Sequence, residues 1–175
     1  MKPISSASGP ASSSLPDVDL SEGCGDDLDA INAIVEAAVM SWPLPERVKR
    51  LSLPSYRYTR EDLRHQDVVL ARDKGGSVRG VAVMEEAAPS DVPGANRGLL
   101  LHGLYVHPDV HGQGIGTRLL AASGDFAARK GFSGVLVKSA NAAVDYFAGR
   151  DLIALPVSDP SRDYPYRFWM PMRDR

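Results

Sequence analysis

The sequence predicts an α/β domain with a single mixed central sheet flanked by helices. Two β-branched runs near the start read as a hairpin, strand and helix patterns alternate after it, and one strand-helix-strand unit follows. The chain has 175 residues, which suits one domain. We place this domain at residues 15–175, after a flexible Ser-rich tail at residues 1–14 that offers almost no bulky apolar side chain to a core.

The first elements are a strand and a helix. Apolar and acidic residues alternate over 15–20, which is typical of a short strand. Asp26 and Asp27 are suited to cap the helix that follows, and Pro43 ends it. A brief second helix is expected over 46–51, before the next proline. The apolar residues that repeat at helical spacing in the first helix are Leu28, Ile31, Ile34, Val35, Ala38 and Val39.

The hairpin and the central strand come next. Residues 67–72 and 77–87 are separated by the turn residues 73–76, so these two strands should pair antiparallel. A Pro- and Gly-containing loop covers 88–98. Residues 99–106 are apolar on both faces, which predicts a central strand.

The rest of the chain begins with the helix of the strand-helix-strand unit. This helix is expected from about residue 114 to residue 130, with Ile115, Leu119 and Phe126 in one stripe and Gly131 as its cap. The remaining elements are a strand, a short helix and two closing strands, over residues 134–138, 141–148, 152–157 and 166–172.

The composition excludes several classes of function. Twenty Lys and Arg against 22 Asp and Glu give a net charge of -2, so no basic excess attracts nucleic acid or anionic lipid. Cys24 is the single cysteine, so an internal disulfide and a cysteine zinc site are both excluded. No apolar run reaches the roughly 18 residues of a membrane span, and the N-terminus lacks a signal core. We therefore expect a cytoplasmic protein with no metal, nucleic-acid or membrane partner.

A glycine-rich turn carries the strongest functional signal. Gly112, Gly114 and Gly116 alternate between the central strand and an amphipathic helix. Glycine permits close approach of a ligand to backbone N–H groups, and the helix start adds free donors, so the turn predicts a phosphate or pyrophosphate site. The alternative is a tight turn without a ligand. Thr117 and Arg118 follow the last glycine, which excludes both the nucleoside-triphosphate loop and the dinucleotide fingerprint.

This stretch resembles motif A of the GNAT superfamily of N-acetyltransferases, and the resemblance extends over about residues 16–172. His111 occupies the usual Gln or Arg position of the motif, and imidazole can still donate a hydrogen bond. The residues that match the motif are Val106, Pro108, Gly114, Ile115 and Gly116.

The resemblance implies that the turn binds the pyrophosphate of acetyl-CoA, and that the strand before it binds the pantetheine arm. Asn141 stands where the family often has a pantetheine-binding asparagine, and a helix cap is its alternative. Arg118 either adds charge to a phosphate or is a solvated helix residue. The implied cofactor-binding residues are Leu104, Tyr105, Val106, His111, Gly112, Gln113, Gly114, Ile115, Gly116, Thr117 and Asn141.

The candidate general base lies in the central strand. The family often places a glutamate early in the motif strand, but residues 99–102 read Leu-Leu-Leu-His. His102 is therefore our candidate base, and a core histidine without a catalytic role is the alternative. Period-two alternation predicts that His102 lies on the same face of the strand as Leu100, Leu104 and Val106. Glycine 103 within this strand predicts a bulge that aims an N–H at the thioester oxygen, or a small residue beneath a neighbouring side chain. Glu85 and Glu86 end the preceding strand, and one of them must face outward.

The family's proton-donating tyrosine is displaced in this sequence. Counted back from Leu152, its position is taken by Phe147, and Tyr146 precedes it. Tyr146 is therefore our candidate acid, with a core aromatic pair as the alternative.

The resemblance implies an acetyltransferase that moves an acetyl group from acetyl-CoA directly to a primary amine of a small molecule or peptide. The alternatives are an inactive CoA-binding sensor or interaction module and a structural domain without a ligand. Tyr56, Arg57, Tyr58 and Arg60 are candidates to favour an acidic or aromatic group near the amine, or are surface residues. A homodimer is also considered, because residues 168–170, Phe-Trp-Met, suit either an interface or the core.

Overall fold

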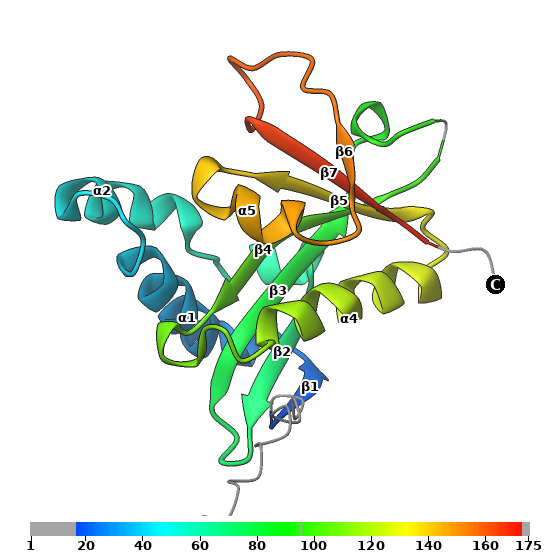
Figure 1. Cartoon of the computed structure of the whole chain (residues 1–175). Helices are drawn as coiled ribbons and strands as arrows, with labels where there is room; N and C mark the ends of the chain where they lie inside the picture. Colours follow the sequence, from blue (N-terminus) through cyan, green and yellow to red (C-terminus); the bar gives the residue numbers. More distant parts are fainter. Residues whose placement is uncertain (1–16, 95, 173–175) are drawn as a thin grey trace, which may run out of the picture.

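A computed structural model describes residues 17–94 and 96–172 (Figure 1). The predicted tail at residues 1–14 lies outside these residues. One seven-stranded sheet in the order β1-β2-β3-β4-β5-β7-β6 forms the centre of the described part. Only β4 and β5 pair in parallel, and the other neighbours are antiparallel, so the predicted mixed sheet is confirmed. The strands are β1 Val18–Glu22, β2 Asp67–Asp73, β3 Val78–Glu86, β4 Leu99–Val106, β5 Gly134–Ser139, β6 Ile153–Leu155 and β7 Tyr166–Pro171.

Two helices cover opposite faces of the sheet (Figure 1). Helix α1 (Leu28–Met40) packs on the face that carries Val68 and Leu70, and α4 (Ile115–Arg129) packs on the face that carries Val69 and Ala71. Successive side chains of a strand point to opposite faces, so one strand contributes to both the core under α1 and the core under α4. The other helices are α2 Glu46–Tyr56, α3 Asp62–His65 and α5 Val144–Ala148, with 3-10 turns η1 Gly25–Asp27, η2 Pro89–Asp91, η3 Pro108–Val110 and η4 Asn141–Ala143.

The region between α1 and β2 differs from its prediction. Helix α2 continues beyond residue 51 to Tyr56 and includes Pro54, which has no N–H to donate to the Arg50 carbonyl one turn earlier. The unpredicted α3 has a local cause: the Asp62 carboxylate accepts hydrogen bonds from the Thr59 N–H and hydroxyl, at 2.7 and 2.8 Å. In return, the Thr59 hydroxyl accepts from the Asp62 N–H.

Strand β4 has the predicted bounds and the predicted central place, but its alternation is interrupted. Val83 pairs with Gly103 and Met84 with Leu101, so His102 is the extra residue of a β-bulge. Beyond the bulge Leu104 packs with Leu101 on the α4 face. The prediction that His102 shares a face with Leu104 was wrong, because the bulge shifts the period by one residue.

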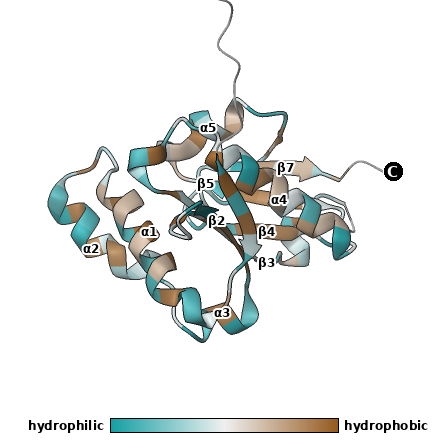
Figure 2. Cartoon of the chain, turned by 90° about the horizontal axis from the view of Figure 1, so that it is seen from below, coloured by the Kyte–Doolittle hydropathy of each residue, from teal (hydrophilic) through white to brown (hydrophobic). Residues whose placement is uncertain are grey.

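Hydrophobic residues concentrate on the strands, whereas much of α2 and α3 is hydrophilic (Figure 2). Phe168 and Trp169 on β7 are each 6% exposed, so both belong to the core. None of the helices among the described residues is long and apolar enough to cross a membrane.

Candidate functional site

The sheet opens between β4 and β5. These strands pair only from Leu99–Val135 to Leu101–Val137. Beyond that point β4 continues to Val106 and β5 to Ser139, without further pairing between them. The separated ends leave backbone groups of β4 available to an extended ligand.

The glycine-rich turn lies directly after the free end of β4. Gly112 and Gly114 have φ angles of 75° and 83°, in the left-handed region, and Gly114 is the N-cap of α4. A Cβ built on Gly112 would meet no atom within 4 Å, so this side of the turn is open. The 15-residue helix α4 begins at this turn, and the first N–H groups of an α-helix have no partner within the helix.

A pocket of about 760 Å³ lies between the turn, the opened strands and α5. All the predicted cofactor-binding residues except Gln113 line it. The lining residues are Ala38, Trp42, Leu44, Tyr56, Leu104, Tyr105, Val106, Val110, His111, Gly112, Gly114, Ile115, Gly116, Thr117, Ala140, Asn141, Ala143, Tyr146, Phe147 and Arg150.

Tyr146 and Arg150 form one wall of this first pocket. The Tyr146 hydroxyl is buried and has no hydrogen-bond partner among the described residues, and it would lie 2.8 Å from a Cβ on Gly116. The Arg150 guanidinium stacks 3.6 Å from the centre of the Tyr146 ring and donates to the Thr117 hydroxyl at 2.7 Å. Phe147 is buried in the core. Sequence reasoning missed Arg150, although its spacing of four residues from Tyr146 could have indicated the pairing.

These features fit acetyl-CoA. The open glycine turn and the Arg150 cation suit phosphate groups. The orphaned Tyr146 hydroxyl and the unpartnered Nε of Arg150 are buried donors that a polar ligand would satisfy.

The remaining predicted residues near the turn have different partners. His111 donates from Nε2 to the Val106 carbonyl at 2.8 Å, so it fastens the turn to the end of β4. Arg118 is half-buried and donates to the Val18 carbonyl. Ala140 is the N-cap of η4, so Asn141 lines the pocket and is not the cap.

A second pocket, of about 680 Å³, adjoins the first, and Tyr56 and Tyr105 line both. His102 lies here, with its Nδ1 3.2 Å from the Tyr58 hydroxyl. Gly103 is required because a Cβ would lie 2.3 Å from that hydroxyl and 2.6 Å from the Tyr105 ring. The lining residues are Ser55, Tyr56, Arg57, Tyr58, Asp62, Gln66, Glu85, Leu100, Leu101, His102, Tyr105, Lys138 and Tyr164.

The environment of the second pocket shifts the pKa values of four of its side chains. Burial raises the pKa of Tyr58 and of Tyr105 well above the ordinary range, so both hydroxyls stay protonated. Hydrogen bonds from Thr59 lower the pKa of Asp62. Burial would lower the pKa of Lys138, but two carboxylates outweigh it and raise that pKa.

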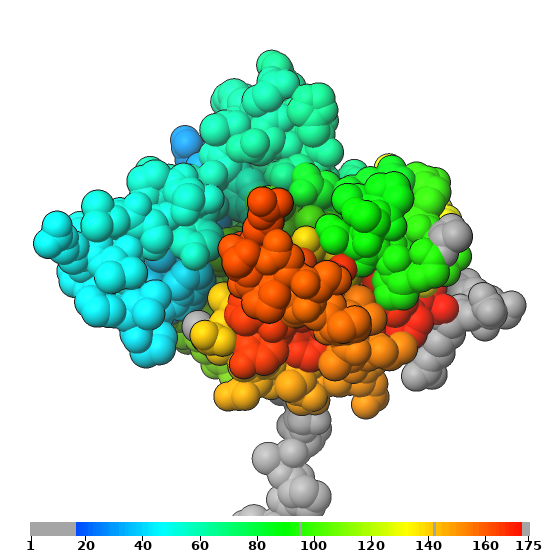
Figure 3. Space-filling view, turned by 90° about the horizontal axis from the view of Figure 1, so that it is seen from above, coloured from blue at the N-terminus to red at the C-terminus, as the bar shows by residue number. Residues whose placement is uncertain are grey.

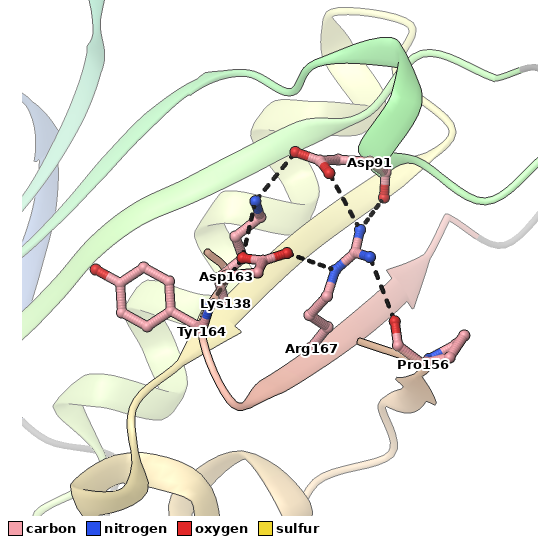
Figure 4. A network of polar contacts seen from close by, with 6 residues as sticks. All are labelled: Asp91, Lys138, Pro156, Asp163, Tyr164 and Arg167. Atoms are coloured by element: carbon pink, nitrogen blue, oxygen red, sulfur yellow. Dashed lines mark hydrogen bonds and ion pairs between the residues drawn. The ribbon is translucent and has the colours of Figure 1, made fainter. Parts of the chain in front are cut away.

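Those two carboxylates belong to an ion-pair network that sequence reasoning missed (Figure 4). Lys138 lies 3.0 Å from Asp91 and 3.2 Å from Asp163, and both acids also pair with Arg167. The network joins β5, β7, the segment before β7 and the 3-10 turn η2 between β3 and β4, and the Tyr164 ring points away from it. Figure 3 shows the segment before β7, in orange, between α2 and the residues that follow β3.

The side chains of Glu85 and Glu86 point in different directions, and one of them faces outward as predicted. Glu85 lines the second pocket and accepts from Gln66 Nε2 at 3.2 Å, whereas Glu86 is exposed and pairs with Arg97. Residues 17–94 and 96–172 hold no cluster of three or more His, Cys, Asp or Glu side chains that could bind a metal ion.

Comparisons with known structures find the same fold. A GCN5-related N-acetyltransferase from Rhodopseudomonas palustris is 21% identical, with a TM-score of 0.62 over 90% of this chain and 96% of that chain. The PaiA N-acetyltransferase from Thermoplasma acidophilum, a complex with coenzyme A, is 11% identical, with a TM-score of 0.70 over 88% and 98%. A GNAT acetyltransferase from Staphylococcus aureus is 10% identical, with a TM-score of 0.64 over 89% and 99%.

No curated protein sequence matches the chain at a significant level. The family model described as "Acetyltransferase (GNAT) family" matches residues 32–150, from α1 through the opened strands and the glycine turn to Arg150. With the sheet order, the opening beside β4 and this match, the chain belongs to the GNAT family of acetyltransferases.

Proposed function

We propose that this protein transfers an acetyl group from acetyl-CoA directly to a primary amine. The observation that carries the proposal is the pair of pockets that meet at Tyr56 and Tyr105, beside the opening between β4 and β5. Acetyl-CoA would occupy the first pocket, with its phosphates on the 111–117 turn and its pantetheine arm along β4. The amine would enter from the second pocket.

The reaction exchanges one bond for another. The amine nitrogen attacks the thioester carbonyl carbon, the N–C bond forms, the C–S bond breaks, and CoA leaves as a thiolate. The amine must lose a proton, and the thiolate gains one. Holding the two reactants in line contributes up to about 7 to 11 kcal/mol to catalysis in favourable cases.

His102 is the proposed base. Its hydrogen bond with Tyr58 determines which ring nitrogen carries the hydrogen, and so whether the other nitrogen can accept a proton. If Nδ1–H donates to the Tyr58 oxygen, the Nε2 lone pair is free to take the proton of the amine. If Tyr58 donates to Nδ1 instead, Nε2 carries the hydrogen and cannot accept. The base role therefore needs the first arrangement.

Tyr146 is the proposed acid, because its hydroxyl is a buried donor on the cofactor side. The Gly103 N–H, at the bulge, is the proposed donor to the developing oxyanion. Negative charge appears on the leaving sulfur and on the thioester oxygen during acyl transfer, so each proposed role would be to supply a donor to one of them.

The test is release of free CoA from acetyl-CoA, followed with a thiol reagent, across a panel of alkylamines, amino acids, aminoglycosides and peptides with free N-termini. We expect release that depends on both enzyme and amine. Tight binding of acetyl-CoA by calorimetry, without release for any amine, would identify a CoA-binding module instead. Absence of both binding and release would leave a structural domain.

A further inference from the structure

We infer that the acetyl acceptor is a small amine that carries a second positive charge, held in the second pocket by Glu85, Asp62 and Gln66. This inference rests on the proposed function and specifies the substrate class. An aliphatic diamine is the simplest such acceptor.

The first support is the charge left over in this pocket. Its two permanent cations are already neutralised: Lys138 by Asp91 and Asp163, and Arg57 by Glu36. In contrast, no ion pair among the described residues involves Asp62 or Glu85, whose partners are the uncharged side chains of Thr59 and Gln66 and the Thr59 N–H. Two carboxylate charges therefore face the pocket without a counter-ion.

The second support is the hydrogen-bonding character of the same wall. The Gln66 Oε1 atom is buried and has no hydrogen-bond partner among the residues described. Gln66 lines the pocket together with Glu85 and Asp62, so the polar groups of this wall without a bound donor are acceptors. An ammonium group offers three donors and no acceptor, so it complements this wall, whereas a carboxylate does not.

The third support is the aromatic surface between this wall and the opening of the sheet. Tyr56, Tyr58, Tyr105 and Tyr164 line the pocket. Tyrosine rings attract cations through the negative face of the ring. The raised pKa values of Tyr58 and Tyr105 keep these rings uncharged but do not remove that attraction.

From the sequence, Tyr56, Arg57, Tyr58 and Arg60 were candidates to favour an acidic or aromatic group near the amine, with surface residues as the alternative. Arg57 pairs with Glu36, and Arg60, which lies near Asp26 at the surface, is not among the residues that line this pocket. The structure therefore favours the opposite sign of charge on the acceptor.

The experiment compares three acceptors of the same chain length: 1-aminobutane, 1,4-diaminobutane and 4-aminobutanoate. We expect kcat/KM for the diamine to exceed that for the monoamine by about tenfold or more, as one charge-assisted contact provides. The amino acid should be the poorest of the three. A preference for 4-aminobutanoate, or equal values for all three, would overturn the inference.

A matched pair of variants locates the effect. Glu85→Gln removes one of the two unpaired charges, and Glu86→Gln changes the neighbouring glutamate, which pairs with Arg97 at the surface. The diamine-to-monoamine ratio should fall at least severalfold in Glu85→Gln and stay at the wild-type value in Glu86→Gln. An equal loss for all three amines in Glu85→Gln would mean that Glu85 serves the reaction itself, and would also overturn the inference.

Failure of the inference and failure of the proposed function give different results. If the amine panel identifies an acceptor that lacks a second cationic group and is preferred to the diamine, only the inference fails. If no amine at all releases CoA, the proposed function fails first.

Discussion

Gly112 and Gly131 form a matched pair with which to test the glycine turn. Their φ angles are 75° and 74°, and a Cβ at either position would meet no atom within 4 Å. Valine at either should cost about 1 to 2 kcal/mol of stability, because both backbones are left-handed. Only Gly112 lines the first pocket. Calorimetry should therefore show acetyl-CoA binding about tenfold weaker or worse in Gly112→Val and unchanged in Gly131→Val. Equal affinities would remove the turn from the cofactor site.

His102→Gln tests the base. Acetyl-CoA affinity should be retained, because His102 lines only the second pocket. Turnover should fall by roughly 10² to 10⁴, which is typical of a lost general base. His65→Gln is the control, since His65 is exposed and pairs with Glu61 on α3. Unchanged turnover in His102→Gln between about pH 6 and 9 would leave water as the proton acceptor.

Tyr146→Phe tests the acid. The lost hydroxyl has no hydrogen-bond partner in the described part of the chain, so the free energy of unfolding should stay the same or rise. Turnover should be slower at neutral pH, and the defect should shrink as the pH passes about 8.5, where a free thiolate is a good leaving group. Tyr166→Phe, on the exposed part of β7, is the control. A defect independent of pH would indicate that Tyr146 shapes the pocket instead.

The individual residues of the glycine-rich turn could be predicted from the sequence better than those of the second pocket. Spacing along one segment is enough to place Gly112, Gly114 and Ile115 together. The hydrogen-bond partner of His102, Tyr58, comes from the segment between α2 and α3, and other residues of this pocket come from α2, α3, β3, β5 and the segment before β7. These neighbours depend on tertiary packing that no local pattern carries. Glu85 was one of two neighbouring glutamates, and only the register with β4 shows which of them faces the pocket.

Among the elements, β4 determines the site. Its bounds could be predicted because it is apolar throughout, and its central place follows from having cores on both faces. Gly103 indicated a bulge as one of two alternatives, but the sequence could not show that His102 is the extra residue, because a bulge is defined by the pairing with β3. The same bulge turns His102 towards Tyr58 and returns Leu104 to the α4 face.

The segment before β7 depends on the network around Lys138, and Asp163→Asn tests this. Burial would raise the pKa of Asp163, but the Tyr164 N–H, Lys138 and Arg167 outweigh it and hold that pKa below 3.8. A depressed pKa stabilises the fold above about pH 4 and loses that contribution as the pH falls through the folded-state value. The variant should lose roughly 1 to 3 kcal/mol at neutral pH, with a smaller difference from wild type in acid.

Asp159→Asn is the control for this experiment, because Asp159 is exposed in the same segment and lies outside the network. Unfolding by denaturant at several pH values measures both variants. A constant difference between wild type and Asp163→Asn from neutral pH to about pH 3 would contradict a role for the carboxylate charge.

On the scale of the whole molecule, the alternation of strands and helices was enough to predict the mixed sheet. The same alternation could not predict that the sheet opens. Both β4 and β5 have ordinary strand patterns along their whole length, and nothing in those patterns shows that the two strands separate after three paired positions. That opening places one pocket on the side of α4 and α5 and lets a second one meet it at Tyr56 and Tyr105. This arrangement supports the proposal that acetyl-CoA and the amine enter from different sides.

The most direct test of this account is a product analysis with acetyl-CoA labelled with ¹³C in the acetyl group and 1,4-diaminobutane as acceptor. Mass spectrometry should find labelled N-acetyl amine and free CoA in equal amounts, formed only when enzyme and both substrates are present, with the mass of the protein unchanged. A labelled acetyl group retained on the protein would contradict direct transfer. Bound acetyl-CoA that yields no acetylated product with this amine, or with any of the panel, would contradict the acetyltransferase function itself.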